Sequence, residues 1–543
     1  MNHNTQTPNC RASVKRHLAA LALGGLVLSL SACSDHNNHD ATEVDGGASA
    51  PDGGAAIETV EVSVKQGKLA GKQAGATRTF LGIPYAEPPV GARRFLPPKP
   101  IANWEGTKQA FGLGASCPQS ASALSAPGTY DEDCLTLNVY GPHDPSTKLP
   151  VMVWIYGGAF VSGGSNQYDA QRLASEGPVV VVTLNYRLGA LGFMSLAALD
   201  AERAGVASGN DGLRDQQLAL QWVQDNIASF GGDADNVTVF GESAGSMSTC
   251  LHMVSPTSRT LAKRFIMESG ACVGGLAVSD KAAATAVAEK LVKAFCDGRS
   301  DVTACLREQD ASDLVAYGAS DGIFGAGWGP VADPADDFLP DLPAKLIAAG
   351  NYNKGDVILG TNKNEWGLFL LLGASPAITD QASLSTAINT QFGALAPQVA
   401  AHYTATDATA HDVFVRAVTD AAFRCPTRAL ARLISAQGSR THLYSFEEGA
   451  AFHAFEIPYV FGTPQVALGA PSLVEPLRAS VQSYWRAFAS TGDPNVSGQP
   501  NWPAYDTAGD AHMTLQAEAA ASSGLSKDDC DFWTTLAAST TSF

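Results

Sequence analysis

The chain has 543 residues, of which 45% are hydrophobic and only 16% are charged, which excludes a disordered or fibrous protein. So long a chain can bury a sizeable core, and a single unit of this size is typical of large α/β enzymes. The formal net charge of −18 repels nucleic acid and anionic lipid headgroups, so we expect neither as a binding partner.

Residues 1–32 are expected to be an export signal. Three basic residues precede the apolar stretch 18–30, which is too short and too sharply ended to span a bilayer. The stretch ends in Leu-Ser-Ala-Cys, which resembles a bacterial lipobox with Cys33 as the lipidated residue. An ordinary signal peptide with a cysteine near its cleavage site is the alternative. We therefore expect an exported protein that is held on the bacterial cell envelope by a lipid, with no other membrane contact.

Residues 33–56 are rich in Gly, Ala, Asp and Asn and are expected to form a flexible tether. Residues 57–543 then read as one continuous domain, with no internal repeat. Of the ten cysteines, eight remain when Cys10 in the signal and Cys33 are set aside. An even number in an exported chain predicts disulfides, but the sequence alone allows 105 connectivities.

Within residues 57–543, short runs that are apolar on both faces alternate with helical patterns. Strands without alternation are expected in a sheet that helices cover on both sides. Between two of them, residues 212–227 carry apolar side chains four apart, as at Leu218 and Trp222. The order predicts an α/β fold with a large, mostly parallel sheet and right-handed crossovers. The strand-like runs are residues 151–156, 179–186, 237–240, 265–267 and 357–359.

The pentapeptide Gly-Glu-Ser-Ala-Gly at 241–245 follows one of these strands and precedes a helical pattern that starts near Ser246. In this setting G-x-S-x-G forms a strained elbow that exposes the serine hydroxyl, so we expect Ser243 to be a nucleophile. A small-residue turn is the alternative. The nucleophile needs N–H donors for the developing oxyanion, and the backbone of Gly158, Ala159 and Ala244 offers three. Read alone, the glycines at 157 and 158 also fit a simple loop.

A histidine must act as the base, but composition does not choose among the seven in the folded part. These are His143, His252, His402, His411, His442, His453 and His512.

Seven separated segments decide the matter by resemblance. They are "FGESAGS" (240–246), "WIYGGAF" (154–160), "GIPYAEPPVGARRF" (82–95), "EDCLTLNVY" (132–140), "GNDGLRDQQLALQWVQDNIASFGGD" (209–233), "GTNKNEWGLF" (360–369) and "FHAFEIPYVFG" (452–462). Together they resemble the type-B carboxylesterase and cholinesterase-like family of α/β-hydrolases, from about residue 60 to the C-terminus. The resemblance implies a serine carboxylesterase that hydrolyses a small-molecule ester through an acyl-enzyme, with no cofactor and no metal.

The resemblance also implies a Ser–Glu–His triad of Ser243, Glu365 and His453, in the chain order of α/β-hydrolases. His453 would take the proton of Ser243, and Glu365 would orient the imidazole. Local sequence alone would make Glu365 a solvated turn residue. Ala159 stands where many relatives have a third glycine, and we expect the oxyanion hole to survive there if φ is negative. Trp366 is inserted relative to the commoner Glu-Gly form and should alter the loop slightly.

The cysteines are paired by the same resemblance. It implies disulfides Cys117–Cys134, Cys296–Cys305 and Cys425–Cys530, which leaves Cys250–Cys272 as the last pair. The loop closed by the first pair is short and has no tryptophan, so choline esters are not expected as substrates.

Three residues are candidates for the substrate pocket. Phe324 and Trp328 lie where the family often lines its acyl pocket, although both also fit ordinary core or loop positions. Glu242, beside the nucleophile, either tunes the site electrostatically or is only a turn residue. Two other functions stay open: a catalytically inactive adhesion protein, and an amidase or lipase that uses the same triad.

Overall fold

The computed structural model describes residues 57–122, 124–143, 148–203, 205–274, 278–318, 326–404, 408–464 and 472–539. The expected signal, tether and Cys33, and the pocket candidate Phe324, lie outside these residues. The described residues belong to one compact unit, Ala55–Phe543. None of the helices in these ranges is both long enough and apolar enough to cross a bilayer.

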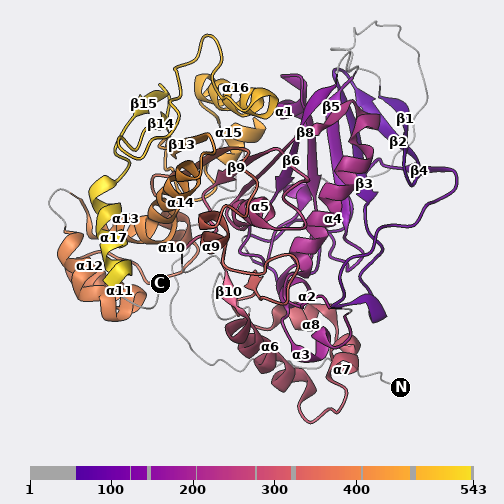
Figure 1. The fold of residues 1–543 in the computed structure, drawn as a ribbon, viewed down its shortest axis with the longest axis horizontal. Coiled ribbons are helices and arrows are strands. Elements are labelled where there is room, and N and C mark those ends of the chain that lie inside the picture. Colours follow the sequence, from indigo (N-terminus) through magenta and orange to yellow (C-terminus); the bar gives the residue numbers. More distant parts are fainter. Residues whose placement is uncertain are drawn as a thin grey trace, which may run out of the picture. The chain divides into compact units, whose positions relative to one another are not determined.

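A 13-stranded sheet runs through the unit in the order β1-β2-β3-β5-β7-β6-β8-β9-β12-β13-β14-β15, with β4 beside β2 (Figure 1). A separate pair, β10 and β11, forms a 2-stranded sheet. The strands are β1 Glu58–Val64, β2 Gly67–Ala74, β3 Thr77–Pro84, β4 Thr107–Gln109, β5 Thr136–Pro142, β6 Leu149–Ile155, β7 Val180–Leu184, β8 Gly232–Glu242, β9 Arg264–Glu268, β10 Ser279–Asp280, β11 Val331–Ala332, β12 Asp356–Asn362, β13 Thr441–Phe446, β14 His512–Leu515 and β15 Ala520–Ser522.

The sheet is parallel from β7 through β6, β8, β9, β12 and β13 to β14. The N-terminal strands β1, β2, β3, β5 and β7 pair antiparallel, as β14 and β15 do. All five strand-like runs of the sequence fall in the parallel part, and the predicted fold class is confirmed. The antiparallel strands were not predicted, because a half-exposed strand such as β1 lacks a continuous apolar run.

Every residue of β7, β9 and β13 is buried, whichever face of the sheet its side chain points to. The parallel strands are therefore covered on both faces, as expected when helices pack on each side of a sheet. The predicted helix at 212–227 is α4. The α-helices are α1 Gln171–Ser175, α2 Gly189–Phe193, α3 Ala197–Asp200, α4 Asp211–Asn226, α5 Ala244–Val254, α6 Lys281–Cys296, α7 Val302–Glu308, α8 Ala311–Ala316, α9 Pro343–Ala348, α10 Trp366–Leu371, α11 Gln381–Phe392, α12 Ala396–His402, α13 Ala410–Thr419, α14 Cys425–Ala436, α15 Ile457–Phe461, α16 Glu475–Thr491 and α17 Lys527–Ser539.

Shorter helical turns of other types complete the fold. The π-helical turn η6, Asp420–Arg424, joins α13 directly to α14. The 3-10 turns are η1 Gly91–Arg93, η2 Ser165–Gln167, η3 Ile227–Phe230 and η5 Gly393–Leu395.

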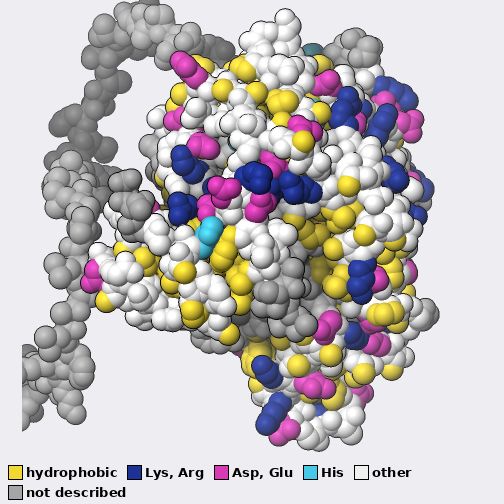
Figure 2. All heavy atoms as spheres, turned by 60° about the vertical axis from the view of Figure 1, so that its left-hand side comes forward, with side chains coloured by type: hydrophobic (Ala, Val, Ile, Leu, Met, Phe, Trp, Pro, Cys, Tyr) yellow, Lys and Arg dark blue, Asp and Glu magenta, His cyan; other side chains and the backbone are white. Residues whose placement is uncertain are grey.

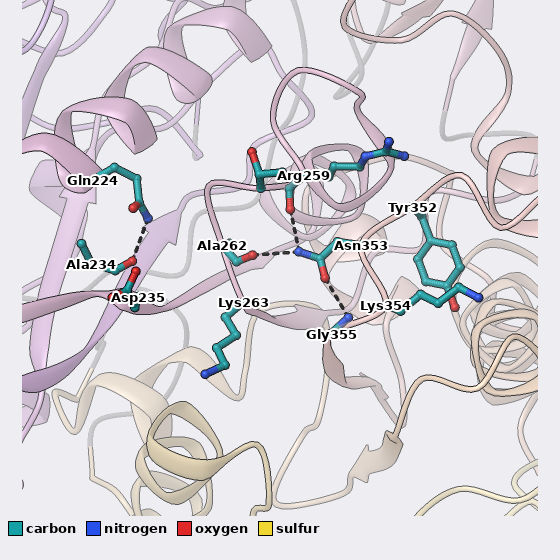
Figure 3. Close-up of a pocket in the computed structure, with 11 residues that line it drawn as sticks. Gln224, Ala234, Asp235, Arg259, Ala262, Lys263, Tyr352, Asn353, Lys354 and Gly355 are labelled. Atoms are coloured by element: carbon teal, nitrogen blue, oxygen red, sulfur yellow. Dashed lines mark hydrogen bonds between the residues drawn. The ribbon is translucent and has the colours of Figure 1, made fainter.

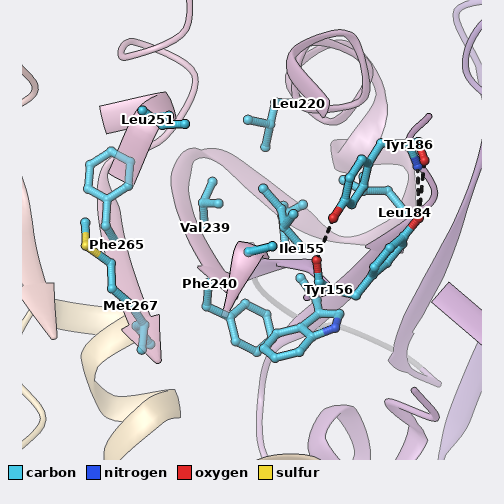
Figure 4. Close-up of a cluster of buried hydrophobic side chains, with 14 of the residues drawn as sticks. Ile155, Tyr156, Leu184, Tyr186, Leu220, Val239, Phe240, Leu251, Phe265 and Met267 are labelled. Atoms are coloured by element: carbon cyan, nitrogen blue, oxygen red, sulfur yellow. Dashed lines mark hydrogen bonds between the residues drawn. The ribbon is translucent and has the colours of Figure 1, made fainter. Parts of the chain in front are cut away.

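Two hydrophobic cores pack separately. The main core surrounds the central strands and includes Ile155, Tyr156 and Phe240 (Figure 4). There the Tyr186 hydroxyl donates a 2.9 Å hydrogen bond to the backbone oxygen of Tyr156. The second core lies among α10, α11, α12, α13, η6 and α17 and includes Trp366. Figure 1 places most of these helices together at one end of the sheet, beside β13 and β14.

The described part of the chain contains four disulfides, in the pairs that the resemblance implied: Cys117–Cys134, Cys250–Cys272, Cys296–Cys305 and Cys425–Cys530. The last one ties the start of α14 to α17 and therefore closes the second core across 105 residues of chain. On the face drawn in Figure 2, acidic and basic side chains lie next to one another.

Candidate active site

Ser243 lies in a tight turn between the end of β8 and the start of α5, which begins at Ala244 rather than near Ser246. Its φ of 56° and ψ of −123° are strained for a residue with a side chain, and the Ser243 N–H is fixed by a 2.8 Å bond to the Glu268 oxygen. A Cβ on Gly241 would come within 2.5 Å of the Ile155 oxygen. Only glycine fits so close to β6, and the sequence therefore forces the elbow at Ser243.

His453 and Glu365 reach each other from two loops that follow adjacent parallel strands. Glu365 follows β12 and His453 follows β13. The His453 Nδ1 and the Glu365 Oε2 are 2.7 Å apart, and the other oxygen of Glu365 accepts a 2.7 Å bond from the Asn362 N–H. Both side chains are buried. Because the carboxylate faces Nδ1, that nitrogen carries the proton of the neutral ring and Nε2 is left as the basic nitrogen.

The free nitrogen of His453 faces Glu242, the residue before Ser243. The His453 Nε2 and Glu242 Oε1 are 3.1 Å apart, but the two atoms are not aligned for a hydrogen bond. Among the described residues, no hydrogen bond joins Ser243 to His453. Since Glu242 and Ser243 are neighbours on the elbow, Nε2 points at the reacting region. Such contacts often tighten only when substrate binds.

Three carboxyls lie buried around the Glu242–His453 pair: those of Glu456, Glu268 and Glu365. The Glu456 carboxyl accepts bonds of 3.1 Å from the Ser269 hydroxyl and 2.5 Å from the Asn362 amide. The Glu268 carboxyl accepts a 2.8 Å bond from the Trp485 indole. Burial raises the pKa of Glu456 to about 7 and that of Glu268 well above its usual range, and in both cases neighbouring carboxylates add to the rise. The third carboxyl is Glu365 itself.

Burial alone would lower the pKa of His453, but Glu242, Glu365 and Glu456 raise it to about 9. Burial in turn raises the pKa of Glu242 to about 8, although His453 opposes the rise. The charge of each group shifts the pKa of the other, so Glu242 and His453 titrate together.

Ser243 and Ala244 open into a pocket of about 220 Å³. Among the described residues that line it, none has a charged side chain. The rings of Phe369 and Phe423 also contact the His453 ring, at centroid distances of 5.0 and 4.9 Å. Ser243 and two rings that contact His453 therefore line one pocket. The remaining lining residues are Ala159, Phe160, Met247, Val278, Ser279, Gly327, Trp328, Gly329 and Pro330.

Sequence reasoning missed Phe369 and Phe423. A signal existed for Phe369, which lies four residues after Glu365 and hence on the same side of α10. No local signal pointed to Phe423, whose direction depends on the π-helical turn η6. Trp328, which the resemblance did suggest, is buried and lines the pocket.

The loop that carries the expected oxyanion donors departs from expectation at Ala159. Its φ is 55°, so the condition set for the oxyanion hole at this position, a negative φ, is not met. The reason is a tight reversal: the Gly158 oxygen accepts 3.0 Å bonds from the N–H groups of Val161 and Ser162. An alanine pays about 1–2 kcal/mol for this left-handed conformation, which a glycine adopts freely. Ala159 and Ala244 line the pocket, whereas Gly158 is not among its lining residues.

His252, another candidate base, has no free nitrogen. Its ring nitrogens lie 2.7 Å from the Ser258 hydroxyl and 2.9 Å from the Gln216 amide oxygen. Burial lowers its pKa to about 3, so it is a neutral structural histidine. No group of three or more His, Cys, Asp or Glu side chains in the described ranges could hold a metal ion.

A second hollow, of about 620 Å³, lies where the strands β8, β9 and β12 begin (Figure 3). The elbow and the loops that carry Glu365 and His453 lie at the opposite end of the sheet, where β8, β12 and β13 end. Asn353 shapes it by donating bonds of 2.6 and 2.8 Å to the backbone oxygens of Arg259 and Ala262. The side chains of Arg259, Lys263 and Lys354 point in different directions in Figure 3. The described residues that line the hollow include no serine, cysteine or histidine, so it offers no pair of nucleophile and base like that at the elbow.

Comparison with known proteins identifies the family of the chain. Residues 58–533 match the model of the Carboxylesterase family, and the chain belongs to that family. A similar relative is the para-nitrobenzyl esterase of Bacillus subtilis (strain 168), which is 37% identical over 468 residues, or 82% of this chain and 92% of the relative. The protein is therefore a serine carboxylesterase that hydrolyses carboxylic esters, and the predicted family and enzyme class are confirmed.

Proposed function

We propose that Ser243, His453 and Glu365 hydrolyse uncharged carboxylic esters through an acyl-enzyme. One observation carries the proposal. The strained elbow presents Ser243 to an apolar pocket that is also lined by Phe369 and Phe423. These two rings contact the ring of His453, which is hydrogen-bonded to the buried carboxylate of Glu365.

In the first half-reaction the Ser243 Oγ attacks the ester carbonyl carbon while the His453 Nε2 takes its proton. The carbonyl oxygen becomes an oxyanion, and the N–H group of Ala244, next to Ser243 at the pocket, donates to it. Gly158 and Ala159, in the facing loop, are the candidates for further donors. The imidazolium is stabilised by Glu365 at 2.7 Å. When the tetrahedral intermediate collapses, the His453 Nε2 gives the proton to the leaving alcohol, and the acyl group stays on Ser243.

In the second half-reaction water takes the place of the alcohol. The His453 Nε2 removes a proton from the water as its oxygen attacks the acyl carbon, and then returns the proton to the Ser243 Oγ as the carboxylic acid leaves. The buried acidic surroundings of His453 favour the imidazolium that forms in both steps.

The pocket supports esters with uncharged, compact or flat groups. A charged group would lose its water in this pocket without finding an opposite charge among the lining residues that the structure describes. Aromatic side chains from Phe160, Trp328, Phe369 and Phe423 offer faces for a ring. The relative is named for para-nitrobenzyl esters, and an aromatic ester of this kind suits the pocket of our chain.

The direct test is Ser243→Ala together with labelling by a fluorophosphonate. We expect a folded variant with hydrolysis reduced by about 10⁴-fold or more and no labelling. Ser246→Ala is the matched control, because Ser246 lies on the helix that follows Ser243. Its hydroxyl donates a 2.6 Å hydrogen bond to the Gly270 oxygen. If the fluorophosphonate did not label the wild-type protein, the alternative of a catalytically inactive adhesion protein would be favoured.

A substrate panel separates the remaining activities. Soluble esters, the matching amides and emulsified triglycerides differ in leaving group and in physical state but use the same triad. We expect turnover of soluble esters to exceed that of the other two classes. A preference for amides or for emulsions would replace the esterase assignment by an amidase or a lipase.

We further propose that the protein is exported and anchored through a lipid on Cys33. The support is the basic and apolar segment before Cys33 and the lipobox-like Leu-Ser-Ala-Cys. Cys33→Ser should move the esterase from the membrane fraction to the soluble fraction. Unchanged fractionation would rule out the anchor without touching the catalytic proposal.

A further inference from the structure

We propose that Arg424 and Thr419 are positioning residues of the reaction, which hold the backbone on both sides of Glu365 in place against the base. The inference rests on the proposed triad. Thr419 is the last residue of α13, and Arg424 is the last residue of the π-helical turn η6 that follows it. None of the three proposed triad residues lies in this turn.

Both residues bond the backbone of the loop that carries Glu365. An Arg424 Nη2 donates a 2.7 Å bond to the Lys363 oxygen, two residues before the acid. The Thr419 Oγ1 accepts a 3.1 Å bond from the Trp366 N–H, one residue after it. Both side chains are buried, so water cannot readily replace these bonds. The acid loop is thus held on each side of Glu365.

Arg424 is itself held rigidly from the side of the second core. Its Nη1 donates bonds of 2.5 Å to the Asp420 Oδ1 and 3.2 Å to the Ser526 hydroxyl. The Asp420 Oδ2 accepts a 3.0 Å bond from the Tyr403 hydroxyl, which in turn accepts a 2.7 Å bond from the Trp533 indole. The guanidinium fork therefore connects the acid loop to buried groups of the second core.

The same turn also contacts the base. Phe423, next to Arg424 in the chain, lies 4.9 Å from His453 and 5.9 Å from Phe369, measured between ring centroids. A π-helical turn contains one residue more than an α-helical turn, which changes the direction of its side chains, and such turns are frequent at functional sites. Here it lets one turn touch the acid loop with Thr419 and Arg424 and the base with Phe423.

This matters because the acid and the base lie on separate loops, after β12 and after β13. Their 2.7 Å hydrogen bond needs both loops at one spacing. A misplacement of about 1 Å at a catalytic group costs on the order of 100-fold in rate. Three acidic groups face His453: Glu242 from β8, Glu365 from the acid loop and Glu456 from the residue before α15. If the acid loop shifts, the contribution of Glu365 weakens and the pKa of His453 falls.

The test compares two pairs of variants in the full-length protein. Arg424→Gln and Thr419→Val remove the bonds to the acid loop, and for both we expect kcat to fall about 10- to 100-fold with KM changed by less than about threefold. The acid limb of the pH profile of kcat/KM should move to lower pH. Activity is measured on a soluble para-nitrobenzyl ester.

Matched controls lie one turn along, in α14. Arg428 is a buried arginine that pairs with Asp510 at 2.5 Å, and the Thr427 hydroxyl is buried without a hydrogen-bond partner. Arg428→Gln should lower the melting temperature, and Thr427→Val should change little. Neither should move kcat or the acid limb, because neither residue bonds the acid loop.

Arg424→Lys keeps a positive charge beside Asp420 but loses the fork, so we expect activity between that of wild type and Arg424→Gln. A folded Arg424→Gln with the kcat and pH profile of Arg428→Gln would overturn the inference. If Arg424→Gln does not fold, Thr419→Val decides, and a wild-type kcat and pH profile in that variant would overturn it equally. Activity retained in Ser243→Ala would instead refute the triad.

Discussion

Replacing Glu242 by glutamine tests the electrostatics of the site, because it removes a carboxylate without changing its shape. In the proposed mechanism a neutral Nε2 on His453 accepts the Ser243 proton, so kcat/KM should rise with pH through the pKa of His453. That pKa is raised to about 9, with Glu242 the strongest raising influence against the lowering effect of burial. Glu242→Gln should therefore shift the acid limb to lower pH.

The size of the shift follows from the separation of the two charges. At 3.1 Å and an effective dielectric constant of about 20, two unit charges interact by at most about 5 kcal/mol, which corresponds to about 4 pKa units. The actual shift is smaller, because the pKa of Glu242 is itself raised to about 8 and part of its charge is already neutralised near neutral pH. We expect a shift of between about one and four pH units.

The assay is kcat/KM from pH 5 to 10 on a soluble, uncharged ester, each profile normalised to its own plateau. The matched control is Glu268→Gln. Glu268 lies opposite Glu242 in the register of β8 and β9 but is not among the groups that shift the pKa of His453. An acid limb that stays in place in Glu242→Gln, or one that moves to higher pH, would refute the reasoning.

Three further outcomes follow from the structure. Trp328→Ala should widen the pocket and raise the ratio of kcat/KM for bulky over small acyl groups, measured on a homologous ester series; an unchanged ratio would place Trp328 outside the acyl site. Burial raises the pKa of Glu268, so the folded state holds a proton that the unfolded state releases above pH 4.5. The free energy of unfolding of wild type should therefore fall relative to that of Glu268→Gln as pH rises from 5 to 8. The same pH dependence in both proteins, measured by urea unfolding, would contradict this. Arg187→Met leaves Asp215 buried without its two bonds of 2.8 and 2.7 Å from the guanidinium and should cost about 3–5 kcal/mol, read from the free energy of unfolding in urea; the double variant Arg187→Met/Asp215→Leu should recover most of it.

How far the sequence predicts this site depends on whether a residue's role is set locally. Ser243 could be placed because an apolar strand, two close-packed glycines and a helix are all contiguous with it. Glu365 could not, since its local sequence is that of an exposed turn, and only the family resemblance gave it a role. In the structure it is buried, because the loop after β13 and the end of α13 pack against the turn that carries it.

Other features depend on contacts that no local pattern contains. The positive φ of Ala159 results from the reversal of its loop onto Ser162, and the direction of Phe423 results from an extra residue in a helical turn. The contact of Glu242 with the Nε2 of His453 joins residues 211 positions apart in the chain. The parallel strands, by contrast, were visible as apolar runs because burial on both faces leaves no room for polar residues.

The separate packing of the second core has a practical consequence for anyone who alters this esterase. The nucleophile belongs to the main sheet, whereas Phe369 and Phe423 reach the pocket from helices with their own interior. Changes of selectivity are therefore safest at Val278 and Trp328, which line the pocket but lie outside that interior. Mutations that loosen the second core would change the choice of substrate and the alignment of the acid together, so libraries built there should be sorted by rate before they are sorted by preference.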